Sequence, residues 1–159
     1  VFISKKEYRY FDLIFEVKLD RDDSWTRQLN SGLQFWSYSD NNYSLTGPQI
    51  EIDENDYGGI WDEGGSSGWL VNPEDRENNS WNKGEYNRYH ISVRSNNISL
   101  SINDMQLFST PTSAFNKYYN TSNGTIKNRI GFQIHSPYGN YQHGKKTYFR
   151  NIIIKEYSD

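Results

Sequence analysis

The chain has 159 residues, a length typical of a single domain. Its net charge is −3 and its Lys and Arg residues are scattered, which argues against a nucleic-acid partner or an anionic membrane surface. No apolar run approaches the roughly 20 residues of a membrane-spanning helix. Cysteine is absent, which excludes disulfides and thiolate metal sites, and 13 Tyr, 8 Phe and 5 Trp favour strands over helices.

The N-terminal part alternates between apolar and polar residues with a period of two. Residues 9–19 predict a long strand with one face in the core. Residues 32–38 predict a shorter strand, in which Leu33 and Phe35 face the core and Trp36 lies off the core face. A turn is expected at residues 40–42. Because the first strand begins almost at once, we expect that an N-terminal segment is missing from the chain.

The next strand carries the first candidate site. Over residues 47–54, Gln49, Glu51 and Asp53 fall on the face opposite two isoleucines. Residues two apart on a strand lie about 7 Å apart, so two carboxylates at this spacing raise each other's pKa and can form an acid/base pair. The alternative is the solvated outer face of an edge strand.

Residues 55–84 follow this strand and show no sustained periodicity. So long a segment inside a domain is more often functional than accidental, and this one supplies Trp61 and Trp69 beside the carboxylates. Asp53, Glu54 and Asp56 could hold a structural calcium ion, although their spacing does not match an EF-hand. No other cofactor or metal is expected.

The second half of the chain returns to short alternating segments separated by turn residues. Strands are expected at residues 89–93, 98–102, 105–108, 130–134 and 148–157, with a polar loop over 109–128. Strands at this spacing predict an all-β, antiparallel jelly-roll sandwich. We expect residues 1–159 to form one such domain. The pattern requires no particular oligomeric state.

A second group of candidates comes from this half. His135 ends a strand on the same face as Gln133, and in polar surroundings it could act as a general base, metal ligand or sugar contact. The alternative is a histidine at a loop edge without a function. Trp36, Trp61, Trp69 and Tyr138 are expected to be exposed, where flat rings and convergent polar groups suit a sugar. The alternative for each ring is that it fills an end of the sandwich.

Seven short blocks, in this order, carry a resemblance to a known family. They are Asn30-Ser31-Gly32-Leu33, Gly47-Pro48-Gln49-Ile50-Glu51, Gly59-Ile60-Trp61, Gly84-Glu85-Tyr86-Asn87-Arg88-Tyr89, Asn96-Asn97-Ile98 through Asn103-Asp104, Arg129-Ile130-Gly131-Phe132-Gln133-Ile134-His135 and Phe149-Arg150-Asn151-Ile152. Over most of residues 7–157 the chain resembles the DUF1080 family, also called the 3-keto-disaccharide hydrolase domain.

The resemblance implies a concanavalin A-like lectin/glucanase fold and a secreted or periplasmic bacterial protein that handles carbohydrate. The family is thought to act on glycosides oxidised at C3, where a base removes the C2 hydrogen and the substituent at C1 leaves. We therefore expect a hydrolase or lyase acting on 3-keto-glycosides. The expected catalytic residues are Glu51, His135 and Asp53, and the expected substrate-binding residues are Gln49, Trp36, Trp61, Gln133 and Tyr138.

Two departures from the family pattern leave alternatives open. The acidic strand reads Gly-Pro-Gln49-Ile50-Glu51 where the family commonly reads Gly-Pro-Glu-x-Gln, and Ile134 stands where the family usually has Asp before the histidine. A non-catalytic carbohydrate-binding or adhesion module would tolerate both changes. Glu51-Ile52-Asp53 also resembles the E-x-D-x-E strand of endo-β-glucanases, but Asn55 occupies the place of its third carboxylate.

Overall fold

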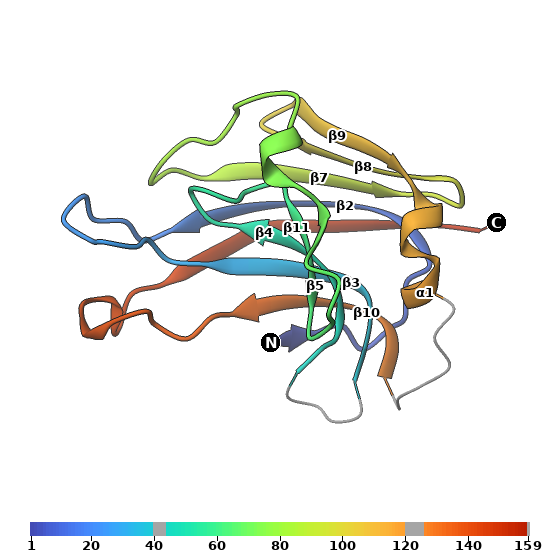
Figure 1. Ribbon diagram of the computed structural model, residues 1–159, viewed down its shortest axis with the longest axis horizontal. Coiled ribbons are helices and arrows are strands. Elements are labelled where there is room, and N and C mark those ends of the chain that lie inside the picture. The colour runs from blue at the N-terminus through green and yellow to red at the C-terminus, as the bar shows by residue number, and fades with distance from the viewer. Residues whose placement is uncertain (40–43, 120–125, 159) are drawn as a thin grey trace.

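The computed structural model describes residues 1–39, 44–119 and 126–158, which form two antiparallel sheets packed face to face (Figure 1). One sheet, sheet A, has the strand order β1 (Phe2–Ile3), β10 (Ile126–Ile134), β3 (Ser31–Ser39), β4 (Gly47–Ile52), β5 (Ile60–Glu63) and β6 (Trp69–Val71). The other, sheet B, has the order β11 (Thr147–Tyr157), β2 (Tyr10–Leu19), β7 (Asn87–Val93), β8 (Asn97–Ile102) and β9 (Met105–Pro111).

Helical structure is limited to short connections. The described residues include the 3₁₀ turns η1 (Pro73–Asp75), η2 (Thr112–Phe115) and η3 (Asn140–Gln142) and the single α-helical turn α1 (Asn116–Tyr119). Within the described ranges, no helix is long and apolar enough to cross a membrane. The turn predicted at residues 40–42 and part of the predicted loop 109–128 lie outside the described residues.

The core lies between the two sheets and follows the alternation of the strands. In β2, Phe11, Phe15 and Val17 are fully buried, and they pack with residues of sheet A such as Leu33 and Ile50, which are also fully buried. Burial of apolar side chains is the main favourable contribution to folding, at about 25 cal/mol per Å² of apolar surface. The predicted all-β antiparallel sandwich is therefore confirmed.

Trp36 departs from the predicted alternation, and its predicted exposure is wrong. Its side chain is only 2% exposed and belongs to the core, and its Nε1 donates a hydrogen bond to the Arg9 carbonyl oxygen at 2.7 Å. The pairing of β3 with β10 shifts register between Ser37 and Gln34, and Trp36 has a φ of +47°. Because a bulge adds a residue to one strand, Phe35 and Trp36 are both buried.

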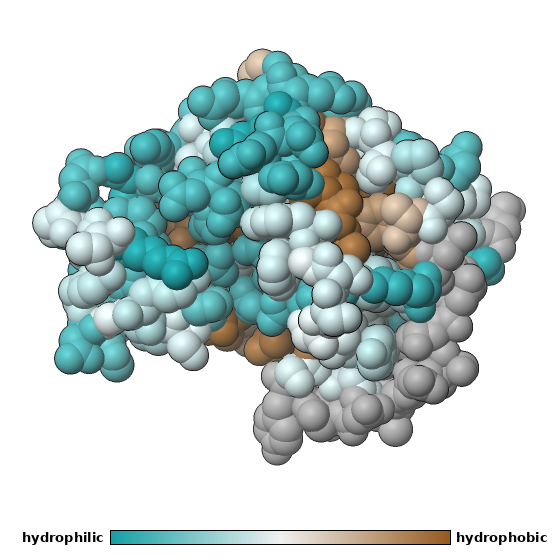
Figure 2. All heavy atoms as spheres, in the orientation of Figure 1, coloured by the Kyte–Doolittle hydropathy of each residue, from teal (hydrophilic) through white to brown (hydrophobic). Residues whose placement is uncertain are grey.

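The outer surface is mostly polar, but apolar side chains remain exposed near β1, β10 and β11. Figure 2 shows hydrophilic residues over most of one view, with apolar residues in narrower strips between them. Phe2 is 67% exposed, Ile134 64% and Ile153 61%. Ile130 and Ile134 fall on the same face of β10, but only Ile130 is buried, because Ile134 lies at the end of the strand.

Candidate functional site

The register of sheet A gathers the polar residues of four strands on the face that points away from the core. Glu51 on β4 is paired with Gly32 on β3, and Gly32 is paired with Gln133 on β10. Gln49 is paired with Trp61 on β5. Residues paired across antiparallel strands project from the same face. This face is consequently built from segments that are up to a hundred residues apart in the sequence.

These residues line an open cavity of about 220 Å³, which we call the acidic cavity. Its lining residues are Arg27, Asn30, Gln49, Glu51, Asp56, Trp61, Glu63, Trp69, Gln133, His135 and Tyr138. Six of the eight residues predicted to form the site are therefore brought together with Trp69: Glu51, His135, Gln49, Trp61, Gln133 and Tyr138. Trp36 and Asp53 are not among the lining residues.

Glu51 is the most perturbed acid of this cavity. It is 7% exposed, its Oε1 accepts a hydrogen bond from Gln49 Nε2 at 2.8 Å, and its Oε2 accepts one from Asn30 Nδ2 at 3.1 Å. Burial raises the pKa of Glu51 from 4.5 to about 7, and the nearby carboxylates of Asp53 and Glu63 raise it against the two amide hydrogen bonds. Near neutral pH, Glu51 is therefore present in both protonation states.

The strand that carries Glu51 is not the solvated edge considered above. β4 lies between β3 and β5, and all of its residues are buried. The Gln49 side chain lies over Gly32, where an added Cβ would stand 2.4 Å from Gln49 Cδ. Any larger residue at position 32 would displace Gln49, so this glycine makes room for the floor of the cavity.

His135 stands at the rim of the acidic cavity with its side chain exposed. Its Nδ1 lies 2.6 Å from the Ser136 carbonyl oxygen. A carbonyl oxygen only accepts hydrogen bonds, so we assign the proton of the neutral ring to Nδ1. Nε2 then carries the lone pair and can take a proton. The ring also contacts Tyr138, with the two ring centroids 4.6 Å apart.

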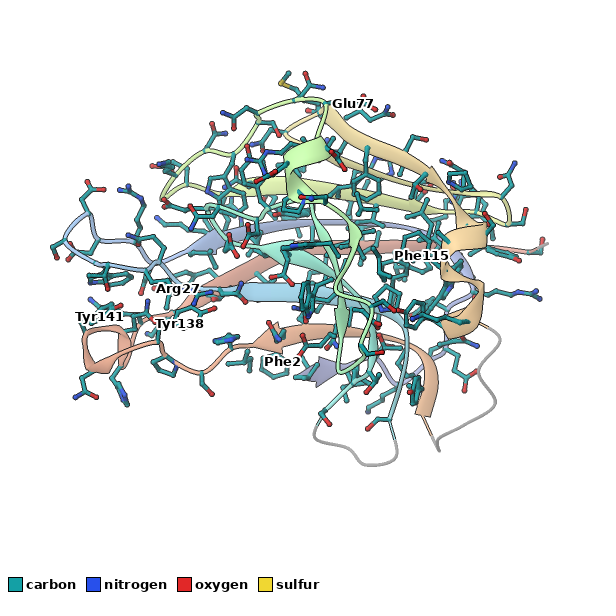
Figure 3. All side chains as sticks on the ribbon, in the orientation of Figure 1. Phe2, Arg27, Glu77, Phe115, Tyr138 and Tyr141 are labelled. Carbon is teal, nitrogen blue, oxygen red and sulfur yellow. The ribbon has the colours of Figure 1, made fainter. Side chains whose placement is uncertain are left out.

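Arg27 and Tyr138, which also line the cavity, lie close together (Figure 3). The Arg27 guanidinium carbon lies 3.8 Å from the Tyr138 ring centroid, a stacked cation–π contact. Buried Gln142 holds both residues in place, because its Oε1 accepts the Tyr138 N–H at 2.7 Å and its Nε2 donates to the Arg27 carbonyl oxygen at 2.5 Å. One side chain thus joins the loop before β3 to the loop after β10.

Trp61 and Trp69 form an aromatic wall. They are paired across β5 and β6, their ring centroids are 5.1 Å apart in an edge-to-face arrangement, and each is 37% exposed. Gly59 allows this packing, since a Cβ there would lie 2.7 Å from the Trp69 ring. The predicted exposure of these two tryptophans is confirmed, and their rings offer a flat apolar surface beside Glu51.

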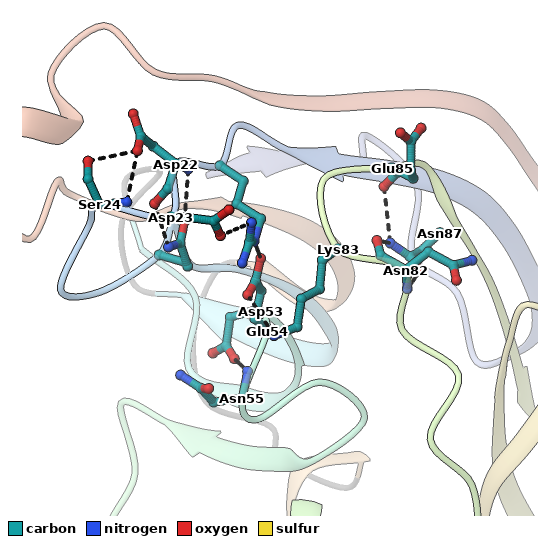
Figure 4. A network of polar contacts seen from close by, with 12 residues as sticks. Asp22, Asp23, Ser24, Asp53, Glu54, Asn55, Asn82, Lys83, Glu85 and Asn87 are labelled. Atoms are coloured by element: carbon teal, nitrogen blue, oxygen red, sulfur yellow. Dashed lines mark hydrogen bonds and ion pairs between the residues drawn. The ribbon is translucent and has the colours of Figure 1, made fainter.

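Asp53 is engaged by the turn that follows β4 (Figure 4). Its Oδ1 accepts the backbone N–H groups of Asn55 at 2.7 Å and Asp56 at 2.6 Å, and its Oδ2 accepts Asn30 Nδ2 at 2.8 Å. This is the pattern of an aspartate that stabilises a turn. Asp53 is 8% exposed, about as buried as Glu51, and Asn30 Nδ2 donates to both carboxylates, so the two lie side by side as the alternation predicts. Asp53 does not line the acidic cavity itself.

The calcium site considered for this turn finds no support in the donor geometry. Glu54 is ion-paired with Arg21 and, at 3.7 Å, with Lys83, so its carboxylate is already neutralised. Across the described parts of the chain, no three His, Asp or Glu side chains are close enough together to hold a metal ion.

Arg27, Asn30 and Glu63 were not singled out from the sequence. Glu63 could have been found, because it lies two residues after Trp61 on the same strand and so shares its face. Asn30 comes just before β3, and Arg27 lies in a polar segment without periodicity. For those two, only the folded chain shows what they contact.

Comparison with solved structures supports the fold. A proposed glycosyl hydrolase from Parabacteroides distasonis superposes with a TM-score of 0.66 at 20% identity, covering 98% of this chain and 76% of that one. A second from the same organism gives 0.58 at 17% identity, covering 98% and 82%. Domain 4 of an extracellular arabinanase from Geobacillus stearothermophilus, solved with arabinotriose, gives 0.53 at 13% identity, covering 98% and 65%.

Because these sequence identities are 20% or lower, the superpositions show a shared fold alone. No curated protein sequence matches the chain significantly. The match to a protein family is more specific, since it spans residues 1–155 and therefore includes every lining residue of the acidic cavity. The chain belongs to the family of 3-keto-alpha-glucoside-1,2-lyase-like domains.

Proposed function

We propose that the acidic cavity binds a glycoside oxidised at C3 and cleaves it by an elimination that begins with proton abstraction at C2, the carbon next to the ketone. The observation that carries this proposal is that Glu51, with a pKa of about 7, and His135 line one cavity in a member of this lyase family. Groups whose pKa lies near the working pH are suited to general acid/base catalysis. The cavity also has the aromatic and polar lining expected of a sugar site.

The chemistry needs a base, a proton donor and a positive group near the ketone oxygen. His135 Nε2 takes the C2 proton, and the electron pair of that C–H bond forms an enolate with the C3 ketone. Arg27 stabilises the negative oxygen of the enolate. The enolate then re-forms the ketone with a C1–C2 double bond, the bond from C1 to the leaving oxygen breaks, and protonated Glu51 gives that oxygen its proton. Addition of water across the double bond completes a net hydrolysis.

The remaining lining residues hold the sugar in this scheme. A pyranose ring presents C–H groups to the wall formed by Trp61 and Trp69, and its hydroxyls meet the amides of Gln49 and Gln133. Among the described residues, Oε1 of Gln49 and Oε1 of Gln133 have no hydrogen-bond partner. Buried acceptors without a donor are unfavourable, so a sugar hydroxyl that reaches them gains a hydrogen bond.

We also propose a secreted or periplasmic location.

Turnover of a 3-keto-glycoside and of the matching unoxidised glycoside tests the proposal. The wild type should release the C1 substituent from the 3-keto compound alone. A C2-deuterated substrate should react more slowly, because C2–H cleavage is a step of the mechanism. Glu51→Gln and His135→Ala should each lower kcat by about 100-fold or more. His143→Ala is the control, since this histidine is exposed and does not line the acidic cavity.

The same experiment separates catalysis from binding. Binding of the 3-keto-glycoside without release of the substituent would identify a carbohydrate-binding module, the second function that the family departures at Gln49 and Ile134 allow. Cleavage of the unoxidised glycoside at an equal rate would contradict the elimination mechanism. Absence of both binding and cleavage would contradict the proposed substrate class.

A further inference from the structure

A second cavity adjoins the acidic cavity. It has a volume of about 290 Å³ and lies between the end of β10 and the start of β11, where Lys145 and Lys146 are part of its lining. We call it the lysine cavity. Asn30, Gln133 and His135 line both cavities. The two cavities are therefore neighbours that share one wall.

The two cavities differ in charge. Glu51, Asp56 and Glu63 line the acidic cavity, whereas none of the residues that line the lysine cavity is a carboxylate. Its charged lining consists of Lys145 and Lys146, with His135 at the shared wall. Both volumes are large enough for a small ring. Because the two cavities differ in charge, each favours a different part of one ligand.

The backbone holds the two lysines in place, and the Lys145 ammonium interacts with the Asp22 carboxylate through charge alone. The Lys146 N–H donates to Asp20 Oδ2 at 2.9 Å, the Lys146 carbonyl oxygen accepts the Asp20 N–H at 2.9 Å, and the Lys145 N–H donates to the Gln142 carbonyl oxygen at 3.1 Å. Among the described residues, neither ammonium forms an ion pair; Lys145 Nζ lies 5.6 Å from the Trp25 ring centroid.

The remaining wall of the lysine cavity is largely apolar. It is formed by Leu29, Pro137, Tyr148 and Phe149, together with the mostly exposed Phe2. An apolar wall with two cations at one side suits a ring or carbon skeleton that carries a negative group. A neutral sugar could accept hydrogen bonds from the lysines but would lack the attraction between opposite charges that an anion gains.

We propose that the lysine cavity is a second subsite, which binds the group attached to C1 of the sugar and selects one that carries an anionic substituent such as a carboxylate. This inference rests on the proposed function for the position of the sugar, but not on catalysis. Two kinds of leaving group carry such a carboxylate, a phenol with a carboxylate on its ring and a sugar acid. Lys145 and Lys146 are thereby specificity-determining residues, and His135 lies at the junction where the C1 bond breaks.

The test uses leaving groups without the sugar, so that it is independent of turnover. ¹⁵N-labelled protein is titrated with 4-hydroxybenzoate against phenol, and with glucuronate against glucose, while backbone amide shifts are followed by NMR. The acidic member of at least one pair should bind about fivefold to tenfold more tightly and shift the amides of residues 145–147. The pair that shows the preference identifies the source. High salt should reduce the preference, because exposed charges are screened.

Two variants locate the effect. Lys145→Gln combined with Lys146→Gln should remove the preference for the anion. Lys155→Gln is the control, since Lys155 is exposed on β11 and does not line the cavity. Equal affinity for acidic and neutral members of both pairs would overturn the proposal, and so would a preference that survives in the double variant. Failure of the chain to cleave a 3-keto-glycoside would overturn the proposed function and leave this result intact.

Discussion

Glu51 and Asp12 are carboxylates on strands of opposite sheets, and their partners give them opposite properties. Asp12 on β2 accepts two hydrogen bonds from Arg94 Nη2, at 2.8 and 3.0 Å, and one from the Tyr157 hydroxyl at 2.6 Å. Burial raises the pKa of Asp12, but hydrogen bonds from Tyr157, Ser92 and Arg94 outweigh it and hold the pKa below 3.8. Glu51 has amide donors only, and its pKa rises to about 7.

The comparison shows that burial by itself does not decide the state of a carboxylate in this protein. Both groups lose hydration, but a cation and a phenol replace the water around Asp12, whereas Glu51 is surrounded by neutral amides and further acids. Asp12 is thus fixed as an anion that joins β2 to β11 and the turn after β7. Glu51 remains able to exchange a proton.

Glu51→Gln should produce the largest effect on stability. Because the pKa of Glu51 is about 7 in the folded protein and about 4.5 when unfolded, the folded state holds this proton more tightly. The free energy of unfolding should therefore fall by roughly 3 kcal/mol as the pH rises from 4.5 through 7. The variant lacks this loss, and above pH 7 it should be more stable than the wild type in urea unfolding.

A matched control and a clear contradiction accompany this measurement. Glu77→Gln removes an exposed carboxylate outside the acidic cavity and should leave the pH dependence unchanged. If the wild type and Glu51→Gln lose stability in parallel between pH 5 and pH 8, the raised pKa of Glu51 is wrong.

Asp12→Asn should act in the opposite direction. The lowered pKa of Asp12 means that its stabilising effect is present above pH 3.8 and is lost as the pH falls through its folded pKa. At pH 7 the variant should lose roughly 2 kcal/mol of unfolding free energy, since its hydrogen bonds to Arg94 are charge-assisted. At acidic pH, where Asp12 of the wild type is protonated too, the difference should shrink. A variant as stable as the wild type at pH 7 would remove the contrast between the two carboxylates.

Gln49→Lys would give Glu51 the kind of partner that Asp12 has. The amide Nε2 of Gln49 already contacts Glu51 Oε1, so an ammonium group there should lower the pKa of Glu51. The pH-dependent loss of stability should shrink by roughly half, about 1.5 kcal/mol. A ¹³C titration of the carboxyl group measures the pKa directly. Asn30→Lys approaches Glu51 from its other oxygen and serves if the first variant does not fold. An unchanged pKa in both would contradict the argument.

Asp104→Asn should have the smallest effect. Asp104 also pairs with an arginine, Arg88, but its side chain is 80% exposed. Water solvates both charges, so the variant should lose no more than about 0.5 kcal/mol. Chemical denaturation beside Asp12→Asn compares an exposed pair with a half-buried one. A loss equal to that of Asp12→Asn would mean that burial does not strengthen these pairs.

Much of the fold could be predicted, because alternation is a local property of the chain. The strands predicted at 9–19 and 148–157 match β2 and β11 within a residue or two. The polar face of β4 was also readable from Gln49 and Glu51. Trp36 was misplaced for a physical reason, since a bulge against β10 turned it into the core. Asp53 lies beside Glu51, but backbone N–H groups of the next turn engage it and it does not line the acidic cavity.

The sequence by itself determined which residues of each strand form its apolar side and which form its polar side, because side chains alternate along any strand regardless of its neighbours. The tertiary structure decided which of those polar sides meet. The pairing of Gly32 with both Glu51 and Gln133, and the two hydrogen bonds of Gln142, join segments far apart in the chain. The raised pKa of Glu51 follows from that assembly, because it depends on burial and on neighbours that the local sequence does not specify.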